Sequence, residues 1–175
     1  PHVAAPHVVP IAVRMLDNVI DLNFYPHKKV KHTNLASRSI GLGVMGEAQM
    51  LAERGVKWGS YEHLALIDSV MENISYNVIY ASSNLAVEKG VYPLFEGSKW
   101  SRGVMPIDTA NANAKALLND RGGLFDENAC DWSKLREKVK KDGMRNGYLM
   151  AIAPTSSISI LVGTTQTIEP VYKRK

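Results

Sequence analysis

The most regular pattern in the chain is a seam of apolar residues between positions 61 and 88. Two rows recur every seven positions, namely Leu64, Met71, Val78 and Leu85, and then Ile67, Ile74 and Ala81. This spacing predicts one helix of about 28 residues, roughly 42 Å long. Ser60 is a suitable N-cap and Gly90 a suitable residue after the last turn. Such a helix packs on its own sheet or, alternatively, against a partner helix.

Shorter helical patterns flank this seam. An amphipathic helix is predicted between Pro10 and Pro26, with an apolar face made of Val13, Leu16, Ile20 and Phe24. Three further helices are predicted at 45–54, at 109–118 and from the N-cap Asp131 to Gly143. Residues 30–37 are predicted to be a polar connector, and 104–107 a short extended piece.

Two short apolar runs predict strands between these helices. Residues 149–153 are continuously apolar and are ended by Pro154, which is typical of a strand buried on both faces. A second short strand is predicted at 39–44, directly before the helix at 45–54. The chain therefore reads as an α/β protein.

A cluster of hydroxyl side chains follows the run at 149–153. Pro154 is followed by Thr155, Ser156 and Ser157, and then by an apolar group expected to form a buried helix face, Ile158, Ile160, Leu161 and Val162, before Gly163. Free N–H groups and hydroxyls at the positive end of a helix dipole favour a phosphate group. The alternative is that the hydroxyls only cap their own helix.

A G-x-G-x-x-G spacing at Gly41, Gly43 and Gly46 resembles a dinucleotide-binding loop. Its context is wrong, because no second strand ending in an acidic residue follows about twenty positions later. We expect these glycines to allow close packing of the strand on the helix instead.

Several sequence blocks resemble one enzyme family. The segment APTSSISI, followed by TQTIEPVY, resembles the substrate-phosphate segment of the large (alpha) subunit of ribonucleotide reductases. The blocks LDNVIDLNFYP (16–26), SIGLGVMG (39–46), SRGVMPID (101–108) and GMRN (143–146) agree with that family in its order. The resemblance covers nearly everything after about position 9.

The resemblance implies a fold, a domain division and a binding site. The fold would be part of a ten-stranded α/β barrel, in a helix-rich fragment formed by residues 9–175, with 1–8 as an unmatched N-terminal tail. The substrate-binding residues carried over are Pro154, Thr155, Ser156, Ser157 and Ile158. Many family members have a hydroxyl residue at the last of these positions, so Ile158 would contribute only its backbone N–H.

The resemblance also implies a reaction that this chain cannot complete alone. The family reduces ribonucleoside diphosphates to deoxyribonucleotides for DNA synthesis, using a thiyl radical and a pair of electron-donating cysteines. Cys130 matches none of these cysteines, and we expect it to be inert, since the acidic residues Asp126, Glu127 and Asp131 should raise its pKa. No catalytic residue and no metal ligand is assigned to the chain.

The partners follow from the same resemblance. They would be the remainder of the alpha subunit, a radical-generating beta subunit with its own metal, and thioredoxin or glutaredoxin as reductant. Within the family, the alternative radical source is adenosylcobalamin. An alternative of another class is a non-catalytic scaffold that binds a helical partner through the apolar seam.

Composition narrows the remaining possibilities. The net charge is +4 with a pI near 9.2, but the basic residues are dispersed, so no nucleic-acid partner is predicted. A single cysteine excludes an internal disulfide and fits a reducing compartment. No apolar run is long enough to span a membrane, and no signal peptide is recognised, so we expect a cytoplasmic protein.

Overall fold

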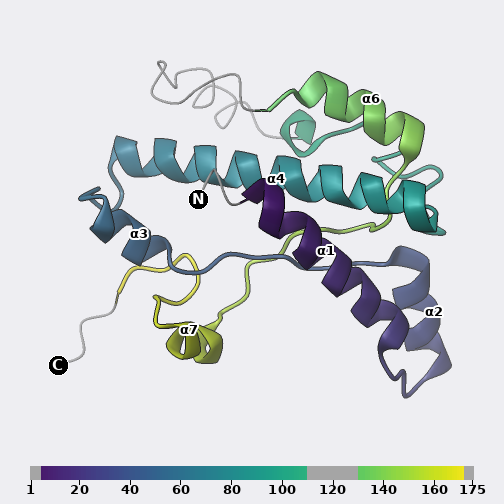
Figure 1. The fold of residues 1–175 in the computed structure, drawn as a ribbon, viewed down its shortest axis with the longest axis horizontal. Helices are drawn as coiled ribbons and strands as arrows, with labels where there is room; N and C mark the ends of the chain where they lie inside the picture. Colours follow the sequence, from purple (N-terminus) through teal and green to yellow (C-terminus); the bar gives the residue numbers. More distant parts are fainter. Residues whose placement is uncertain (1–4, 110–129, 172–175) are drawn as a thin grey trace.

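The computed structural model describes residues 5–109 and 130–171, where the regular elements are helices. In chain order they are α1 (Ala5–Leu22), α2 (Lys28–Ser37), α3 (Glu47–Glu53), α4 (Tyr61–Lys89), the 3-10 helix η1 (Pro106–Thr109), α6 (Trp132–Asp142) and α7 (Ser156–Val162). In Figure 1, α4 is the long element on which α1 and α6 pack. None of the helices in these ranges is long and apolar enough to cross a membrane.

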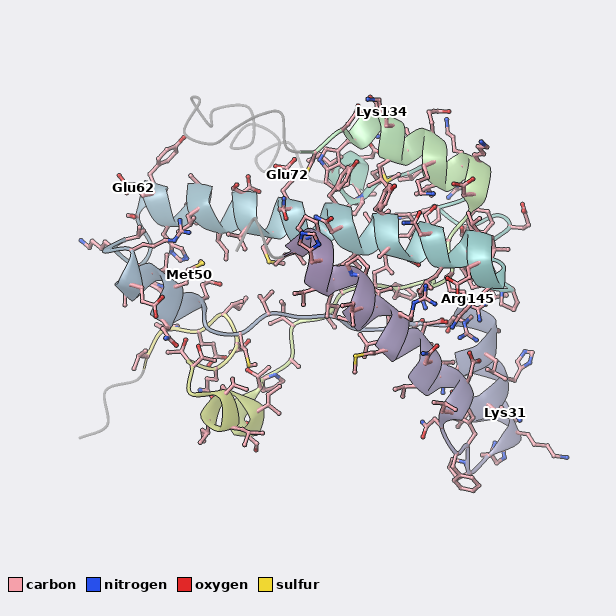
Figure 2. All side chains as sticks on the ribbon, in the orientation of Figure 1. Lys31, Met50, Glu62, Glu72, Lys134 and Arg145 are labelled. Atoms are coloured by element: carbon pink, nitrogen blue, oxygen red, sulfur yellow. The ribbon has the colours of Figure 1, made fainter. Side chains whose placement is uncertain are left out.

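α4 confirms the predicted long helix and its caps. The Ser60 hydroxyl accepts a hydrogen bond from the His63 N–H, and Glu62 lies in the first turn (Figure 2). At the other end, the N–H of Gly90 donates to the carbonyl of Ala86. The acidic residue at the start and Gly90 at the end suit the helix dipole and the exit of the chain.

The predicted seam of α4 is fully buried only in its second half. Val78, Ala81 and Leu85 are in the core, whereas Leu64 is 53% exposed. Leu66 is buried in its place, because Leu51 of α3 packs against that side of the helix. The seven-residue repeat therefore gives the wrong face over the first turns of α4.

α1 is longer than predicted at its start and shorter at its end. It begins at Ala5 and ends at Leu22, so Phe24 lies beyond the helix and is 83% exposed rather than part of the apolar face. The buried side of α1 consists of Ala5, Val9, Val13, Asp17 and Ile20. A second set of apolar side chains on this helix, here named the α1 outer row, is more than half exposed and consists of Val8, Ile11, Met15, Val19 and Leu22.

The prediction of a connector at 30–37 is wrong, because these residues belong to α2. The Nδ1 atom of His27 accepts a hydrogen bond from the Lys29 N–H at the start of the helix. At its end, Arg38 adopts a left-handed conformation and its N–H donates to the Asn34 carbonyl. α2 has no buried residue, so there was no apolar periodicity to indicate it. The extended piece predicted at 104–107 is wrong in its second half, because Pro106 and Ile107 begin η1.

The other predicted elements have mixed outcomes. α3 and α6 confirm the predicted helices, with the Asp131 carboxylate accepting from the Lys134 N–H and Gly143 following α6. The helix predicted at 109–118 lies outside the described residues beyond Thr109, and so does the acidic pair Asp126 and Glu127.

The two predicted strands are reduced to one point of pairing. Leu42 and Met150 form a parallel bridge, and the N–H of Ile40 donates to the carbonyl of Tyr148. No longer strand forms within 5–109 or 130–171. The prediction that 149–153 is buried on both faces is wrong, because Leu149 is 6% exposed but Ile152 is 43% exposed. Pairing with a single neighbour leaves the rest of this segment uncovered.

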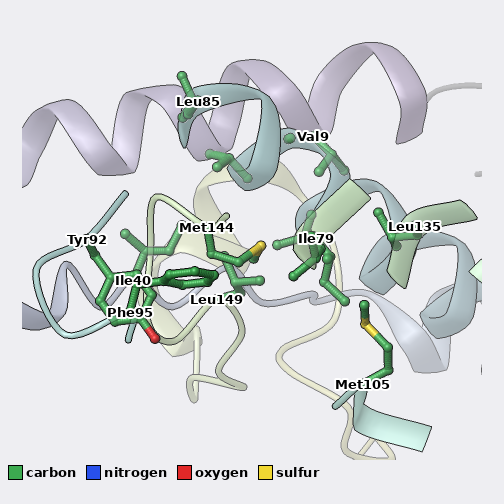
Figure 3. Close-up of a cluster of buried hydrophobic side chains, with 14 of the residues drawn as sticks. Val9, Ile40, Ile79, Leu85, Tyr92, Phe95, Met105, Leu135, Met144 and Leu149 are labelled. Atoms are coloured by element: carbon green, nitrogen blue, oxygen red, sulfur yellow. The ribbon is translucent and has the colours of Figure 1, made fainter. Parts of the chain in front are cut away.

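Residues 39–44 and 147–153, joined by the Leu42–Met150 bridge, are here named the paired segments. The main core lies where α4 meets α1, α6 and these two segments. Figure 3 shows Ile79 and Leu85 of α4, Leu135 of α6, and Met144 and Leu149 from the approach to the bridge. Leu135, Met144 and the nearby Val139 are each at most 1% exposed. Burial of these side chains fixes the segment 144–149 against the helices.

A buried polar network joins α1 to both paired segments. The Asp17 carboxylate is fully buried and accepts hydrogen bonds from the Arg38 guanidinium at 2.8 and 2.9 Å and from the Asn146 amide at 3.1 Å. Asn146 also donates to the Arg38 carbonyl and accepts from the Ser82 hydroxyl. Arg145, near the end of α4 (Figure 2), completes the network at 3.3 Å from Asp17. The carboxylate is buried at low cost because it is so fully bonded.

Candidate functional site

The predicted site residues follow the paired segment 147–153 and form the start of α7. Thr155 is the N-cap, with φ of 51°, and Ser156, Ser157 and Ile158 form the first turn. Ser156, Ser157 and Pro154 are exposed, and Ile158 is 53% exposed. The N–H groups of a first helical turn have no carbonyl partner within the helix. Three consecutive N–H groups are therefore left at an exposed helix end.

The hydroxyls of this segment do not cap α7. Thr155 makes no side-chain cap bond; instead its Oγ1 accepts a hydrogen bond of 2.8 Å from the Thr167 N–H. This contact leaves the hydroxyl proton of Thr155 available for donation. In the described part of the chain, the Ser156 and Ser157 hydroxyls make no hydrogen bond. The capping alternative is thus not supported by the local geometry.

The apolar residues of α7 do not form the predicted buried face. The exposed fractions are 53% for Ile158, 81% for Ile160, 84% for Leu161 and 60% for Val162, and only Ser159 is buried. The helix is seven residues long, and Gly163 ends it in a left-handed conformation as predicted. Packing of α7 against the rest of the described chain is slight.

The turn after α7 is hydrogen-bonded to the N-terminus of α3. The carbonyl of Thr165 accepts from the Gly46 N–H at 2.9 Å, and its Oγ1 accepts from the Gln49 N–H at 3.3 Å. Because Gly46 is the N-cap of α3 and has no side chain, the Thr165 hydroxyl takes the capping role. Figure 1 shows this turn, drawn in yellow, lying beside α3.

The three glycines of the G-x-G-x-x-G spacing allow close approach, but not of a strand to a helix as expected. A Cβ on Gly43 would lie 2.2 Å from the Ala151 carbonyl oxygen, and one on Gly41 would lie 3.1 Å from the Ala151 Cβ. A Cβ on Gly46 would lie 2.6 Å from the Thr164 Oγ1. The glycines thus allow 41–46 to approach Ala151 on one side and Thr164, in the turn after α7, on the other.

Sequence reasoning missed Thr165 and Thr167 as members of this site. Both lie beyond Gly163. The Thr165 hydroxyl accepts from Gln49 and the Thr167 N–H donates to Thr155, and neither contact can be read from the neighbouring sequence. One signal was present: Gly46, at the predicted start of α3, cannot supply a capping side chain. A helix that begins after glycine often takes its cap from elsewhere in the fold.

A cleft of about 710 Å³ lies elsewhere, at the other end of the paired segment. Its lining includes Trp100, Met105, Tyr148 and Met150, with Lys99 as its cation. None of the five predicted site residues lines this cleft. The cleft and the start of α7 are therefore separate features.

The pKa of Cys130 is raised as predicted, but with a different main cause. Burial, followed by the nearby Glu72 carboxylate, raises the pKa of the Cys130 thiol to about 11. The predicted influence of Asp126 and Glu127 lies outside the described residues. Within those residues, no group of three or more histidine, cysteine or acidic side chains could hold a metal ion.

Comparison with known proteins identifies the class to which this fold and segment belong. A family model described as the ribonucleotide reductase barrel domain matches residues 4–175, so the chain belongs to the ribonucleotide reductase barrel-domain family. The relatives it matches are named ribonucleoside-diphosphate reductase subunit alpha.

Three of these relatives show how similar the chain is. It is 70% identical to the protein of Helicobacter pylori, 48% to that of Chlamydia muridarum and 39% to that of a Synechocystis strain. The matches cover 96%, 94% and 94% of this chain but only 21%, 16% and 20% of the relatives. The chain thus spans about a fifth of the length of these proteins.

Proposed function

We propose that this chain supplies the substrate-phosphate segment of a ribonucleoside-diphosphate reductase alpha subunit. The observation that carries the proposal is the exposed start of α7, where three N–H groups and the Ser156 and Ser157 hydroxyls have no partner in the described chain. The Thr155 proton adds a further donor. Such a group of donors matches the acceptor oxygens of a diphosphate.

The roles proposed for the individual residues follow from this arrangement. Pro154 ends the paired segment and, having no N–H, leaves the helix start open. Thr155, Ser156 and Ser157 donate through side chains and backbone, whereas Ile158 donates through its backbone alone.

We further propose that residues 9–175 form part of a ten-stranded α/β barrel. The parallel bridge between Leu42 and Met150 supports this, because parallel neighbours joined by helical crossovers are the repeating unit of such a barrel. The remaining strands would come from the rest of the alpha subunit. Both paired segments would then be extended and covered by neighbours that lie outside this chain.

The radical chemistry would belong to other parts of the assembly. We assign the catalytic cysteines to the remainder of the alpha subunit, radical generation to a metal-containing beta subunit, and re-reduction to thioredoxin or glutaredoxin, in the cytoplasm. The adenosylcobalamin alternative concerns only the radical source and leaves the phosphate segment unchanged. A scaffold acting through the α4 seam is disfavoured, because Val78, Ala81 and Leu85 are buried within this chain.

The proposed site is tested by replacing Ser157 with alanine in the full-length alpha subunit. Loss of one donor to a charged phosphate should weaken binding of the nucleoside diphosphate about tenfold or more. Binding of the corresponding nucleoside should not change, since it has no phosphate. Isothermal titration of both ligands measures the difference.

Thr164→Val is the matched control for Ser157→Ala. The Thr164 hydroxyl lies close by in sequence, yet it makes no hydrogen bond within the described chain. Equal effects of the two substitutions, or an unchanged preference for the diphosphate over the nucleoside, would refute the proposed function.

A further inference from the structure

The start of α7 is fixed by hydrogen bonds rather than by packing. Its apolar residues Ile160 and Leu161 are more than 80% exposed, and Ser159 is the one buried residue of the helix. A seven-residue helix with so little buried surface has no strong preference for one position. The contacts at its two ends must therefore decide where its first turn lies.

Two hydrogen-bonded contacts position the first turn of α7, and both involve the turn that follows this helix. The Thr167 N–H donates to Thr155 Oγ1, which ties the turn after α7 to the N-cap. Thr165 accepts from the N–H groups of Gly46 and Gln49, which ties the same turn to α3. α3 is in turn anchored to α4, because the buried side chains of Glu47 and His63 lie 2.7 Å apart.

The backbone at both threonines supports a specific positioning role. Thr155 has φ of 51° and Thr167 has φ of 41°. β-branched residues rarely adopt this left-handed conformation. It persists only where surrounding contacts determine it, as the hydrogen bond between these two residues does.

We propose that Thr165 and Thr167 are positioning residues for the substrate phosphate, although neither touches it. Thr165 fixes the turn to the N-terminus of α3, and Thr167 fixes the Thr155 hydroxyl with its proton directed away from the Thr167 N–H. This inference rests on the proposed function and extends it to two residues beyond Gly163. The G-x-G-x-x-G segment then supports phosphate binding indirectly, because the N–H of its last glycine, Gly46, donates to the Thr165 carbonyl.

The experiment compares Thr165→Ser, Thr165→Cys and Thr165→Val in the full-length alpha subunit, assayed with its radical-generating partner and reductant. These side chains are progressively weaker acceptors for the Gln49 N–H at similar size. KM for the ribonucleoside diphosphate should rise in that order, reaching about three- to tenfold for Thr165→Val. We expect kcat to stay within twofold and nucleoside binding to remain unchanged.

Controls separate positioning from stability. Thr164→Val, at the neighbouring residue, should leave KM within twofold of the unsubstituted subunit. A fall in melting temperature without a change in KM would mean that Thr165 is merely structural, and it would overturn the inference. If Thr165→Val does not fold, the comparison of Thr165→Ser with Thr165→Cys decides: an equal KM for both overturns the inference.

Ser157→Ala distinguishes the two levels of the proposal. If Ser157→Ala weakens diphosphate binding but the Thr165 series leaves KM unchanged, the phosphate site stands and the positioning role is wrong. If Ser157→Ala leaves the preference for the diphosphate unchanged, both proposals are wrong.

Discussion

Burial determines what the single thiol of this chain can do. With the pKa of Cys130 at about 11, against an ordinary value of 9.0, the reactive thiolate is about one part in a thousand at pH 8. The carboxylate of Glu72 opposes ionisation further, and the same carboxylate accepts a hydrogen bond from Trp132. The residue is suited to packing rather than to electron transfer.

We predict that Cys130 reacts slowly with iodoacetamide at pH 8 and that its rate rises with pH until about 11. The raised pKa of Cys130 is the reason, because only the thiolate attacks the reagent and little thiolate is present at pH 8. Rates measured from pH 7 to 11 on the folded chain check this, with the chain in urea as the control, where the midpoint should fall to about that of a free thiol. A folded-state midpoint at or below 9 would contradict the prediction.

Individual site residues were predictable to different extents. The run from Pro154 to Ile158 was predicted to bind phosphate from its residue types and from the family resemblance together, and this role stays a prediction. Thr165 was not predicted to belong to the site, because hydroxyl residues in turns are common and its partner Gln49 is 116 positions away. A contact over that distance leaves no local signal in the sequence.

Two short helices, α6 and α7, differ sharply in their contribution to the fold. Leu135 of α6 is 1% exposed, whereas Leu161 of α7 is 84% exposed. The sequence pattern predicted a buried apolar face for α7, whereas for α6 it predicted only where the helix begins and ends. The difference arises because α6 lies against α4, while α7 follows an extended segment with one neighbour.

We predict that Leu135→Ala lowers the free energy of unfolding by about 2 to 5 kcal/mol, because it opens a cavity in the core. Leu161→Ala, the matched control, should change it by about 0.5 kcal/mol or less, since this side chain is exposed. Urea denaturation of both variants of this chain gives the comparison. Comparable losses would show that α7 is packed against the rest of the chain.

Element prediction succeeded for helices whose apolar face packs on other helices, and it failed for elements without such a face. α4 and α6 have both an apolar face and capping residues, and both were predicted. α2 has no fully buried side chain, and it is held by the partly buried Leu35, which packs against the core, and by end contacts that include the buried Arg38 side chain. The strands were predicted from their composition, but within the described residues each has one paired neighbour, which gives a single bridge rather than a ladder.

The exposed apolar surface of the whole molecule has a consequence in solution. The α1 outer row and the exposed residues of α7 lie on separate helices, and the paired segments 39–44 and 147–153 have backbone groups without a neighbouring strand in the described chain. Monomeric proteins rarely expose this much apolar surface and open edge together.

We predict that the chain on its own self-associates at micromolar concentration. Light scattering should give a mass above 19.3 kDa that increases with concentration. Val19→Lys in the α1 outer row should reduce the association without loss of helical circular dichroism, because that side chain is 55% exposed. A monodisperse monomer with a cooperative melt would show instead that the chain is a complete domain.

The buried carboxylate of Asp17 also constrains the order in which the chain can fold. Asp17 receives its bonds from Arg38, near in sequence, and from Arg145 and Asn146, which lie 128 and 129 positions away. During synthesis, α1 leaves the ribosome long before those last two residues exist. Docking of α1 on α4 would until then bury a carboxylate without its full set of donors, which is costly. Completion of the core therefore waits on translation beyond position 146, and the high sequence separation makes that closing step intrinsically slow.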